Sequence, residues 1–183
     1  MKYDIIVIGS GPGGYVAAIR AAQLGKNVAV FERAEAGGVR LICGCISIKA
    51  LLKSFQVYNY CKSAEHYGLN FAGEVRPNLE KIVARSRGVA ETMNKGVLFL
   101  LKKNNVELIN GFAKLKGNGR IDVDGTEYEA DHIILATGAR PREMPFMPID
   151  GEHVISSKQA LVLPKLPETM IVVGSSAIGS EFA

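Results

Sequence analysis

Three glycines and one acid near the amino terminus have the residue types and the spacing that bind a dinucleotide. Gly9, Gly11 and Gly14 form a G-x-G-x-x-G pattern, and Glu32 ends the next apolar run. In this pattern the first glycine makes a tight turn, the second lets the backbone approach a diphosphate, and the third lets a helix pack closely on a strand. A carboxylate at the end of the following strand can accept hydrogen bonds from a ribose. A purely structural glycine turn would not need that acid, so the pattern predicts a dinucleotide site.

The segments around these residues indicate the elements that must hold them. Residues 4–8 form a short apolar run rich in β-branched residues, which is typical of a strand buried on both faces of a parallel sheet. A helix is expected to follow the glycines as far as Gly25, and residues 27–31 should form the next strand. The helix would turn an apolar stripe to the sheet, made of Val16, Ala17, Ala21 and Leu24. Its first N–H groups would then point at the phosphates.

The middle of the chain predicts two helices followed by short strands. One helix is expected over residues 49–64 and a longer one from Asn78 onward, where apolar residues recur with a helical period. Strands are expected at residues 106–109, 113–116 and 120–123, with Gly117-Asn118-Gly119 as a hairpin turn. Residues 127–130 could extend that meander, and residues 132–136 form an apolar strand that runs into a turn at Thr137-Gly138. The predicted fold is α/β, a Rossmann-like parallel sheet wrapped by helices with an inserted antiparallel meander.

The end of the chain repeats its beginning. Residues 169–173 are apolar and predict a second buried strand, and Gly174 and Gly179 begin and end a second glycine pattern, with Ser176 in its middle position. The proline-rich stretch before it predicts a linker. We therefore expect a first domain over residues 1–147, a linker over 148–168, and over 169–183 the first strand and turn of a second nucleotide-binding domain that is truncated.

Length and composition exclude several other classes of protein. The chain has 183 residues, of which 48% are hydrophobic and 22% charged, values that are ordinary for a folded soluble protein. Its net charge of +4 comes from scattered basic residues, for which a solvated helix face such as that of Lys81, Arg85 and Arg87 is a sufficient explanation. No signal peptide, membrane span or secreted disulfide framework is expected. The expectations are a cytoplasmic protein with no nucleic-acid partner, no membrane and no metal.

Taken in their order, the motifs resemble those of the flavin-dependent pyridine nucleotide–disulfide oxidoreductases, most closely the branch that oxidises dihydrolipoamide. Leu41 and Ile46 favour that branch. The resemblance covers essentially the whole chain, which would be the first part of a longer one. The segments that carry it are residues 9–25 (GSGPGGYVAAIRAAQLG), 37–49 (GGVRLICGCISIK), 133–141 (IILATGARP) and 171–181 (IVVGSSAIGSE).

The resemblance implies FAD in the first domain and NAD in the second, with electrons passing between NADH, the flavin and a redox disulfide. It implies dihydrolipoamide or a lipoyl domain of a 2-oxo-acid dehydrogenase complex as partner, and a homodimer whose interface domain is absent here. Carried over by residue, the FAD diphosphate would lie at Gly9, Gly11 and Gly14 and the adenosine ribose at Glu32. The other implied positions are Gly37 and Gly38 (the latter near the flavin half), Lys49 near the flavin ring, the Ala113 backbone near the adenine, Thr137 and Gly138 closing over the cofactor, and Gly174 and Gly179 for NAD.

The redox segment departs from the family pattern. That pattern has cysteines at the positions of Arg40 and Cys45, and an arginine cannot form a disulfide, so the usual dithiol cycle is not available. Cys43 is an added thiol, but a bridge to Cys45 would have difficult geometry, so we expect Cys43 to be free. Cys61 is expected to be a core or half-buried residue. A thiol at a helix N-terminus near a positive side chain is typical of reactive cysteines, so Cys45 is either a reactive thiol facing the flavin or an inert one.

By this resemblance the chain is the FAD-binding part of an oxidoreductase that oxidises dihydrolipoamide with NAD⁺. We expect it to be inactive by itself and to bind FAD weakly or not at all, because much of the enclosing surface is missing. Two alternatives stay open. One is a minimal flavin-binding module without disulfide chemistry. The other is a non-catalytic remnant, which the apolar residues 171–173 would favour if they have no sheet to join.

Overall fold

The computed structural model describes residues 1–42, 44–70 and 72–183, with the backbone alone at residues 40 and 42. The chain forms two compact units. The first comprises Met1–Ile42 and Glu91–Arg140, and the second comprises Cys43–Ala90 and Pro141–Ala183. The predicted domains are continuous segments that end at residues 147 and 168, whereas these units combine segments from different parts of the chain. The predicted boundaries therefore stay predictions.

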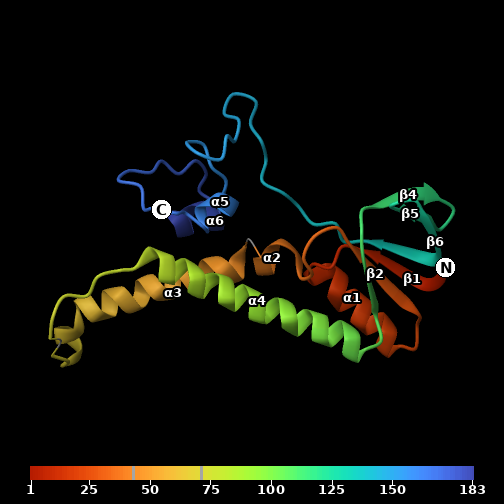
Figure 1. Ribbon diagram of the computed structural model, residues 1–183, viewed down its shortest axis with the longest axis horizontal. Coiled ribbons are helices and arrows are strands. Elements are labelled where there is room, and N and C mark those ends of the chain that lie inside the picture. Colours follow the sequence, from red (N-terminus) through yellow and green to blue (C-terminus); the bar gives the residue numbers. More distant parts are fainter. Residues whose placement is uncertain (43, 71) are drawn as a thin grey trace. The chain divides into compact units, whose positions relative to one another are not determined.

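A six-stranded mixed sheet forms the centre of the first unit (Figure 1). Its order is β3-β2-β1-β6-β5-β4, and β3, β2, β1 and β6 run parallel to one another. The strands are β1 (Lys2–Ile8), β2 (Val28–Glu32), β3 (Glu107–Asn110), β4 (Ala113–Gly117), β5 (Arg120–Val123) and β6 (Thr126–Leu135). The predicted fold class, a Rossmann-like parallel sheet with an antiparallel meander, is confirmed.

Both faces of β1 and β2 are buried, as expected for β-branched strands in a parallel sheet. On one face, Ile6 and Phe31 join a core cluster with Tyr128 of β6, and the rings of Phe31 and Tyr128 meet edge to face with centroids 4.9 Å apart. On the other face Val7 and Val30 are fully buried. This double burial holds the carboxyl ends of the two strands in place.

Helix α1 (Pro12–Gln23) contacts β1 and β2 through its smallest side chains. Gly14, Ala18 and Ala21 are buried, whereas Val16 and Leu24 are 53% and 63% exposed. The predicted apolar stripe is therefore confirmed at Ala21 and wrong at Val16 and Leu24, whereas Ala17 is half-buried. Small residues lie on the inner face because the helix axis runs too close to the strands for larger ones.

The antiparallel meander turns twice at glycine-containing pairs. Asn118 and Gly119 both have positive φ between β4 and β5, which confirms the predicted hairpin turn. Asp124 and Gly125 make the second turn in the same way, between β5 and β6. The expected separation of residues 127–130 from 132–136 is wrong, because β6 is one strand that pairs with β5 along its first part and with β1 from Glu129 to Leu135.

The remaining helices of the first unit are α2 (Gly38–Ile42) and the later part of α4 (Leu79–Lys103), where Val97 and Leu101 are buried. The second unit contains α3 (Cys45–Lys62), the 3-10 turn η1 (Ala64–Tyr67), α5 (Ser157–Ala160), α6 (Ala177–Phe182) and the first part of α4. Helix α3 begins earlier than the predicted residue 49. None of the helices in the described ranges is long and apolar enough to cross a membrane.

Within the second unit, α4 is tied to the backbone of α3. Ser86 donates its hydroxyl to the carbonyl of Ser47 at 3.0 Å, and the Arg85 guanidinium donates to the carbonyl of Ala50 at 2.8 Å. Arg87 donates to the Ser47 hydroxyl. Arg85 is exposed, as expected for a solvated face, although it also donates to α3; for Arg87, which is half-buried and bonded to Ser47, that explanation is wrong.

Residues 169–173 are not a strand in this structure. They lie outside regular structure, and Ile171 and Val173 are 90% and 63% exposed. The expectation of a buried strand is therefore wrong for these residues, because in the described part of the chain no other strand pairs with them. An apolar β-branched run forms a strand only when a partner supplies the second half of each backbone hydrogen bond.

Candidate dinucleotide site

The predicted site residues of the first unit gather at one edge of its sheet. Because β1, β2, β3 and β6 are parallel, their carboxyl ends lie at the same edge. Backbone hydrogen bonds tie these ends together, from Gly9 N–H to the carbonyl of Phe31 at 2.8 Å, from Gly111 N–H to that of Glu32 at 2.9 Å, and from Ala136 N–H to that of Ile8 at 2.8 Å. In open α/β sheets this edge is where ligands bind.

Gly9 and Gly14 are glycines because their surroundings leave no room for a side chain. Gly9 has φ +100°, and a Cβ built on it would lie 2.3 Å from the carbonyl oxygen of Ala136. A Cβ on Gly14 would lie 1.8 Å from the carbonyl oxygen of Gly9. The turn and the close helix packing assigned to these two glycines are therefore present in the backbone.

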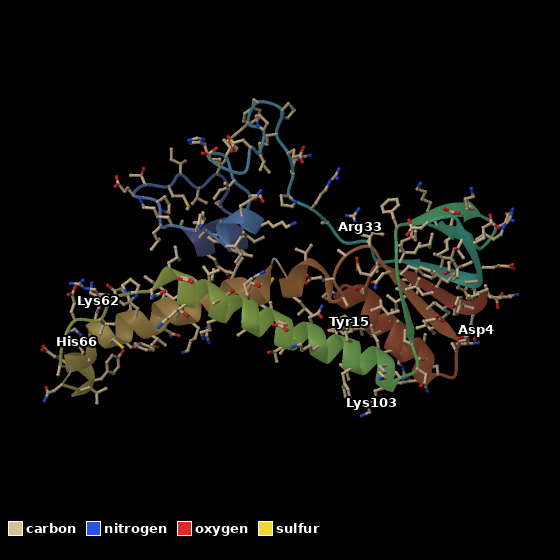
Figure 2. The ribbon with its side chains drawn as sticks, viewed as in Figure 1. Asp4, Tyr15, Arg33, Lys62, His66 and Lys103 are labelled. Carbon is tan, nitrogen blue, oxygen red and sulfur yellow. The ribbon has the colours of Figure 1, made fainter. Side chains whose placement is uncertain are left out.

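Gly11 differs from both. It precedes α1 with φ −64° and ψ −178°, an extended conformation open to any residue. A Cβ built on it would meet no other described atom within 4 Å. Within the described residues, neither the N–H of Gly11 nor that of Gly13 has a hydrogen-bond acceptor. Open space at the start of a helix, bordered by two N–H groups, fits the diphosphate of a dinucleotide. Figure 2 shows Tyr15 one turn further along α1, where its N–H is bonded to the carbonyl of Gly11.

Glu32 is held from the side of the glycine loop. Its Oε2 accepts hydrogen bonds from the N–H and the hydroxyl of Ser10, at 2.9 and 2.7 Å, and its Oε1 accepts one from the N–H of Ala34 at 3.0 Å. Burial acts to raise the pKa of Glu32, but these hydrogen bonds, together with one from the backbone of Arg33, outweigh it, and the pKa lies below the ordinary 4.5. The side chain is a carboxylate at neutral pH, bonded twice by Ser10 at Oε2 and once by Ala34 at Oε1.

The turn at Gly37-Gly38 packs on the glycine loop. The N–H of Gly37 lies 3.1 Å from the Ser10 hydroxyl and 3.2 Å from the Ser10 carbonyl, and it donates to both. A Cβ on Gly38, where φ is +67°, would lie 2.8 Å from the Cα of Gly11. Asn94 of α4 donates its amide to the carbonyl of Ala36 and supports the same turn.

Ala113, Thr137 and Gly138 also lie in the first unit. Ala113 begins β4, close in sequence to Gly111, whose N–H is bonded to the end of β2. Thr137 and Gly138 follow β6 and are exposed, and Gly138 has φ +70°. The structure brings the start of this turn to Gly9, since a Cβ there would lie 3.3 Å from the Cα of Thr137.

Cys45 and Lys49 belong to the second unit. Cys45 is the first residue of α3 and is a free, exposed thiol, and Cys61 is free and half-buried as expected. Lys49 is exposed and forms an ion pair with Glu181. The roles of Cys45 and Lys49 toward a flavin stay predictions. The expected state of Cys43 falls outside the described residues, and so does the side chain of Arg40.

The second glycine pattern has the same local geometry as the first. Gly174 has φ +115°, and a Cβ on Gly179 would lie 1.9 Å from the carbonyl oxygen of Gly174. Ser176 has φ −71° and ψ 174°, close to the values of Gly11. A serine therefore fits the middle position without backbone strain. Ligand binding at Gly174 and Gly179 stays a prediction.

Two residues of the site were not identified from the sequence. Ser10 orients the acid, and Asn94 supports the Gly37-Gly38 turn, from far along the chain. A hydroxyl between the first two glycines of the pattern was an available signal for Ser10. No signal pointed to Asn94, because its partner is a backbone carbonyl. No group of three or more His, Cys, Asp or Glu residues in the described ranges could hold a metal ion.

Comparison with known proteins identifies the family of this chain. The sequence profile of the pyridine nucleotide-disulphide oxidoreductases matches residues 3–183. The chain belongs to this family. Membership in the pyridine nucleotide-disulphide oxidoreductase family implies a flavin cofactor.

Curated relatives are similar over the whole chain. The chain is 49% identical to the dihydrolipoyl dehydrogenase of Zymomonas mobilis, covering 99% of this chain and 40% of that protein. It is 46% identical to that of Rhizobium etli, covering 100% and 42%, and 40% identical to one from Bacillus subtilis, covering 100% and 41%. This chain thus spans about 40% of the length of these members of the pyridine nucleotide-disulphide oxidoreductase family.

The bonds to Glu32 predict how its contribution to stability changes with pH. Because the pKa is lowered on folding, the ionised side chain stabilises the fold above its ordinary value of 4.5, and this contribution is lost as the pH falls through the folded value. We expect Glu32→Gln to have a lower free energy of unfolding than the native protein at pH 6. The gap between the two free energies should narrow below pH 4.5. Urea unfolding at a series of pH values measures the gap. A gap that stays constant down to pH 3 would contradict the assignment.

Proposed function

We propose that this chain forms the FAD-binding part of a dihydrolipoyl dehydrogenase-like oxidoreductase. The observation that carries the proposal is the open position at Gly11, next in the chain to Ser10, which holds the Glu32 carboxylate. Two unbonded N–H groups and an ionised carboxylate at one sheet edge match the two polar parts of an adenine dinucleotide, its diphosphate and its ribose. The name shared by the relatives supports the choice of enzyme.

Each predicted residue has a role in this proposal. The backbone of Gly9, Gly11 and Gly14 shapes the diphosphate site, and Glu32 accepts a hydrogen bond from the adenosine ribose. The proposal places Gly37 and Gly38 against the cofactor, Ala113 near the adenine, Thr137 and Gly138 over the cofactor, and Lys49 and Cys45 toward the flavin. When bound, FAD supplies electron transfer between a pyridine nucleotide and a thiol substrate.

We also propose a reaction for the whole protein. In it dihydrolipoamide, free or on a lipoyl domain, is oxidised by NAD⁺ in a cytoplasmic homodimer, and NAD is held at Gly174 and Gly179. Arg40 limits the chemistry, because a disulfide with Cys45 cannot form at that position. Cys45 is left to act as a single exposed thiol.

A second candidate is a flavin-binding module without disulfide chemistry, and Arg40 favours it. The two candidates share the nucleotide site and differ in the chemistry of the bound flavin. Reduction of that flavin by dihydrolipoamide would support the oxidoreductase. Bound flavin that is reduced by dithionite and reoxidised by air, with no response to dihydrolipoamide, would support the module.

The nucleotide site predicts selectivity among flavins. FAD should bind at least about tenfold more tightly than FMN or riboflavin, because the contacts at Gly11 and Glu32 are to the adenosine diphosphate half that only FAD carries. Quenching of flavin fluorescence on titration with the protein measures the affinity for each of the three flavins. Even where overall binding is weak, equal affinity for FAD and FMN would contradict the proposed site.

A further inference from the structure

Ser10 is the most fully bonded residue of the glycine loop. Its side chain is completely buried. Its N–H and hydroxyl both bind Oε2 of Glu32, and its hydroxyl and carbonyl oxygens both accept from the N–H of Gly37. Three separate segments of the site therefore meet at one serine: the glycine loop, the end of β2 and the Gly37-Gly38 turn.

The hydroxyl of Ser10 has one proton, and the neighbouring groups determine where it points. The N–H of Gly37 can only donate, so the hydroxyl oxygen accepts from it. The ionised carboxylate of Glu32 can only accept, so the hydroxyl proton points to Oε2. The proton is thus unavailable to a ligand. Ser10 can influence a ligand only through the two groups that it holds.

The bonds to Ser10 determine how Glu32 presents its carboxylate. Oε2 is occupied by two donors from Ser10, and Oε1 accepts one from Ala34. The carboxylate is therefore anchored in one orientation before any ligand binds, with two donors from Ser10 on Oε2 and one from Ala34 on Oε1. Anchoring an acceptor in advance reduces the entropy that is lost when a ligand hydroxyl binds it.

We propose that Ser10 is the positioning residue for the ribose of the dinucleotide: it turns Oε1 of Glu32 toward the ribose hydroxyls and joins the Gly37-Gly38 turn to the loop that receives the diphosphate. The inference rests on the proposed function. It goes further by assigning the recognition of the ribose to a pair of residues, of which only the acid touches the ligand.

The test compares ADP with 2′,3′-dideoxy-ADP, which lacks both ribose hydroxyls, by isothermal titration calorimetry on the native 183-residue chain and on Ser10→Ala. The native protein should prefer ADP by roughly tenfold, the size of one hydrogen bond to a charged group. Ser10→Ala should lose most of this preference by binding ADP more weakly, while its affinity for dideoxy-ADP stays the same. General damage to the loop would instead weaken both ligands equally, and that result would overturn the proposal.

Two further variants make the test specific. In a Glu32→Gln background, Ser10→Ala should have almost no further effect on the preference for ADP, because the serine acts through the acid. Ser175→Ala is the matched control, since Ser175 follows the first glycine of the second pattern and is exposed. That variant should keep the native preference. If Ser10→Ala does not fold, Ser10→Cys fills nearly the same space with a weaker donor, and the same criterion applies to it.

The outcomes separate the two proposals. A native protein that binds neither ADP nor FAD contradicts the proposed function itself. A native protein that prefers ADP, combined with a Ser10→Ala variant that keeps this preference, overturns the positioning role and leaves the proposed function intact. Equal binding of ADP and dideoxy-ADP by the native protein also overturns the positioning role, because Glu32 would then not recognise the ribose.

Discussion

Replacing Gly14 by alanine should destabilise the first unit by about 3 kcal/mol or more, the upper end of the cost of overpacking a close contact. The new Cβ would lie 1.8 Å from the carbonyl oxygen of Gly9, which is a backbone atom in a tight turn and cannot rotate away. Helix α1 would have to move off β1, and the contacts of Ala18 and Ala21 would be lost with it.

Urea unfolding followed by circular dichroism measures this loss without any cofactor. Gly13→Ala is the matched control, because a Cβ there would have only the Cβ of Ala136 within range, at 4.0 Å. Alanine at this helical position should leave the stability unchanged or raise it by up to about 1 kcal/mol. If Gly14→Ala unfolded at the same urea concentration as the native protein, the close packing of α1 on the glycine turn would be wrong.

Replacing Gly11 by valine should have the opposite profile, with the fold preserved and the binding of FAD reduced by about a hundredfold. The backbone at Gly11 is extended, and a Cβ there would meet none of the described atoms within 4 Å, so the variant should lose less than about 1 kcal/mol of stability. The branched side chain would instead occupy the space proposed for the diphosphate. An overlap that costs about 1–3 kcal/mol corresponds to roughly five- to 150-fold in affinity, and the bulk of valine places the effect toward the upper end.

Flavin fluorescence titration gives the affinity, and the urea midpoint gives the stability of the same preparation. Gly11→Ala should show a smaller loss of FAD affinity than Gly11→Val, because the obstruction grows with the side chain. Riboflavin lacks the diphosphate, so its binding should change little in either variant. Native FAD affinity in a folded Gly11→Val protein would show that the diphosphate binds elsewhere and would contradict the site.

Local patterns predicted much of this fold correctly. The β-branched runs of β1 and β2, the glycine pattern between them and the hairpin turn at Asn118-Gly119 were all identified from residues adjacent in the chain. These features follow from the conformational preferences of single residues and from side-chain periodicity, both of which are present in the sequence. Gly9 and Gly14, which cannot accept a Cβ, were also predicted from the glycine pattern alone.

Predictions that depended on a distant partner were less successful. Residues 169–173 have the composition of a buried strand and are exposed, because in the described ranges no strand pairs with them. Residues 126–135 form one strand where two were expected, since β1 gives the whole later part a parallel partner. Arg87 was expected on a solvated face, but it is half-buried and donates to the Ser47 hydroxyl of α3.

The sequence by itself determined the β1–α1–β2 unit, the family and the glycine loop, because each depends on residues close together along the chain. Only the tertiary structure decided what Glu32 and Ser10 do. Their hydrogen bonds exist because parallel pairing of β1 with β2 brings the carboxyl ends of both strands to the same edge of the sheet. The strands and the acid could be predicted from the sequence, but the bond between Ser10 and Glu32 depends on the three-dimensional position of both side chains.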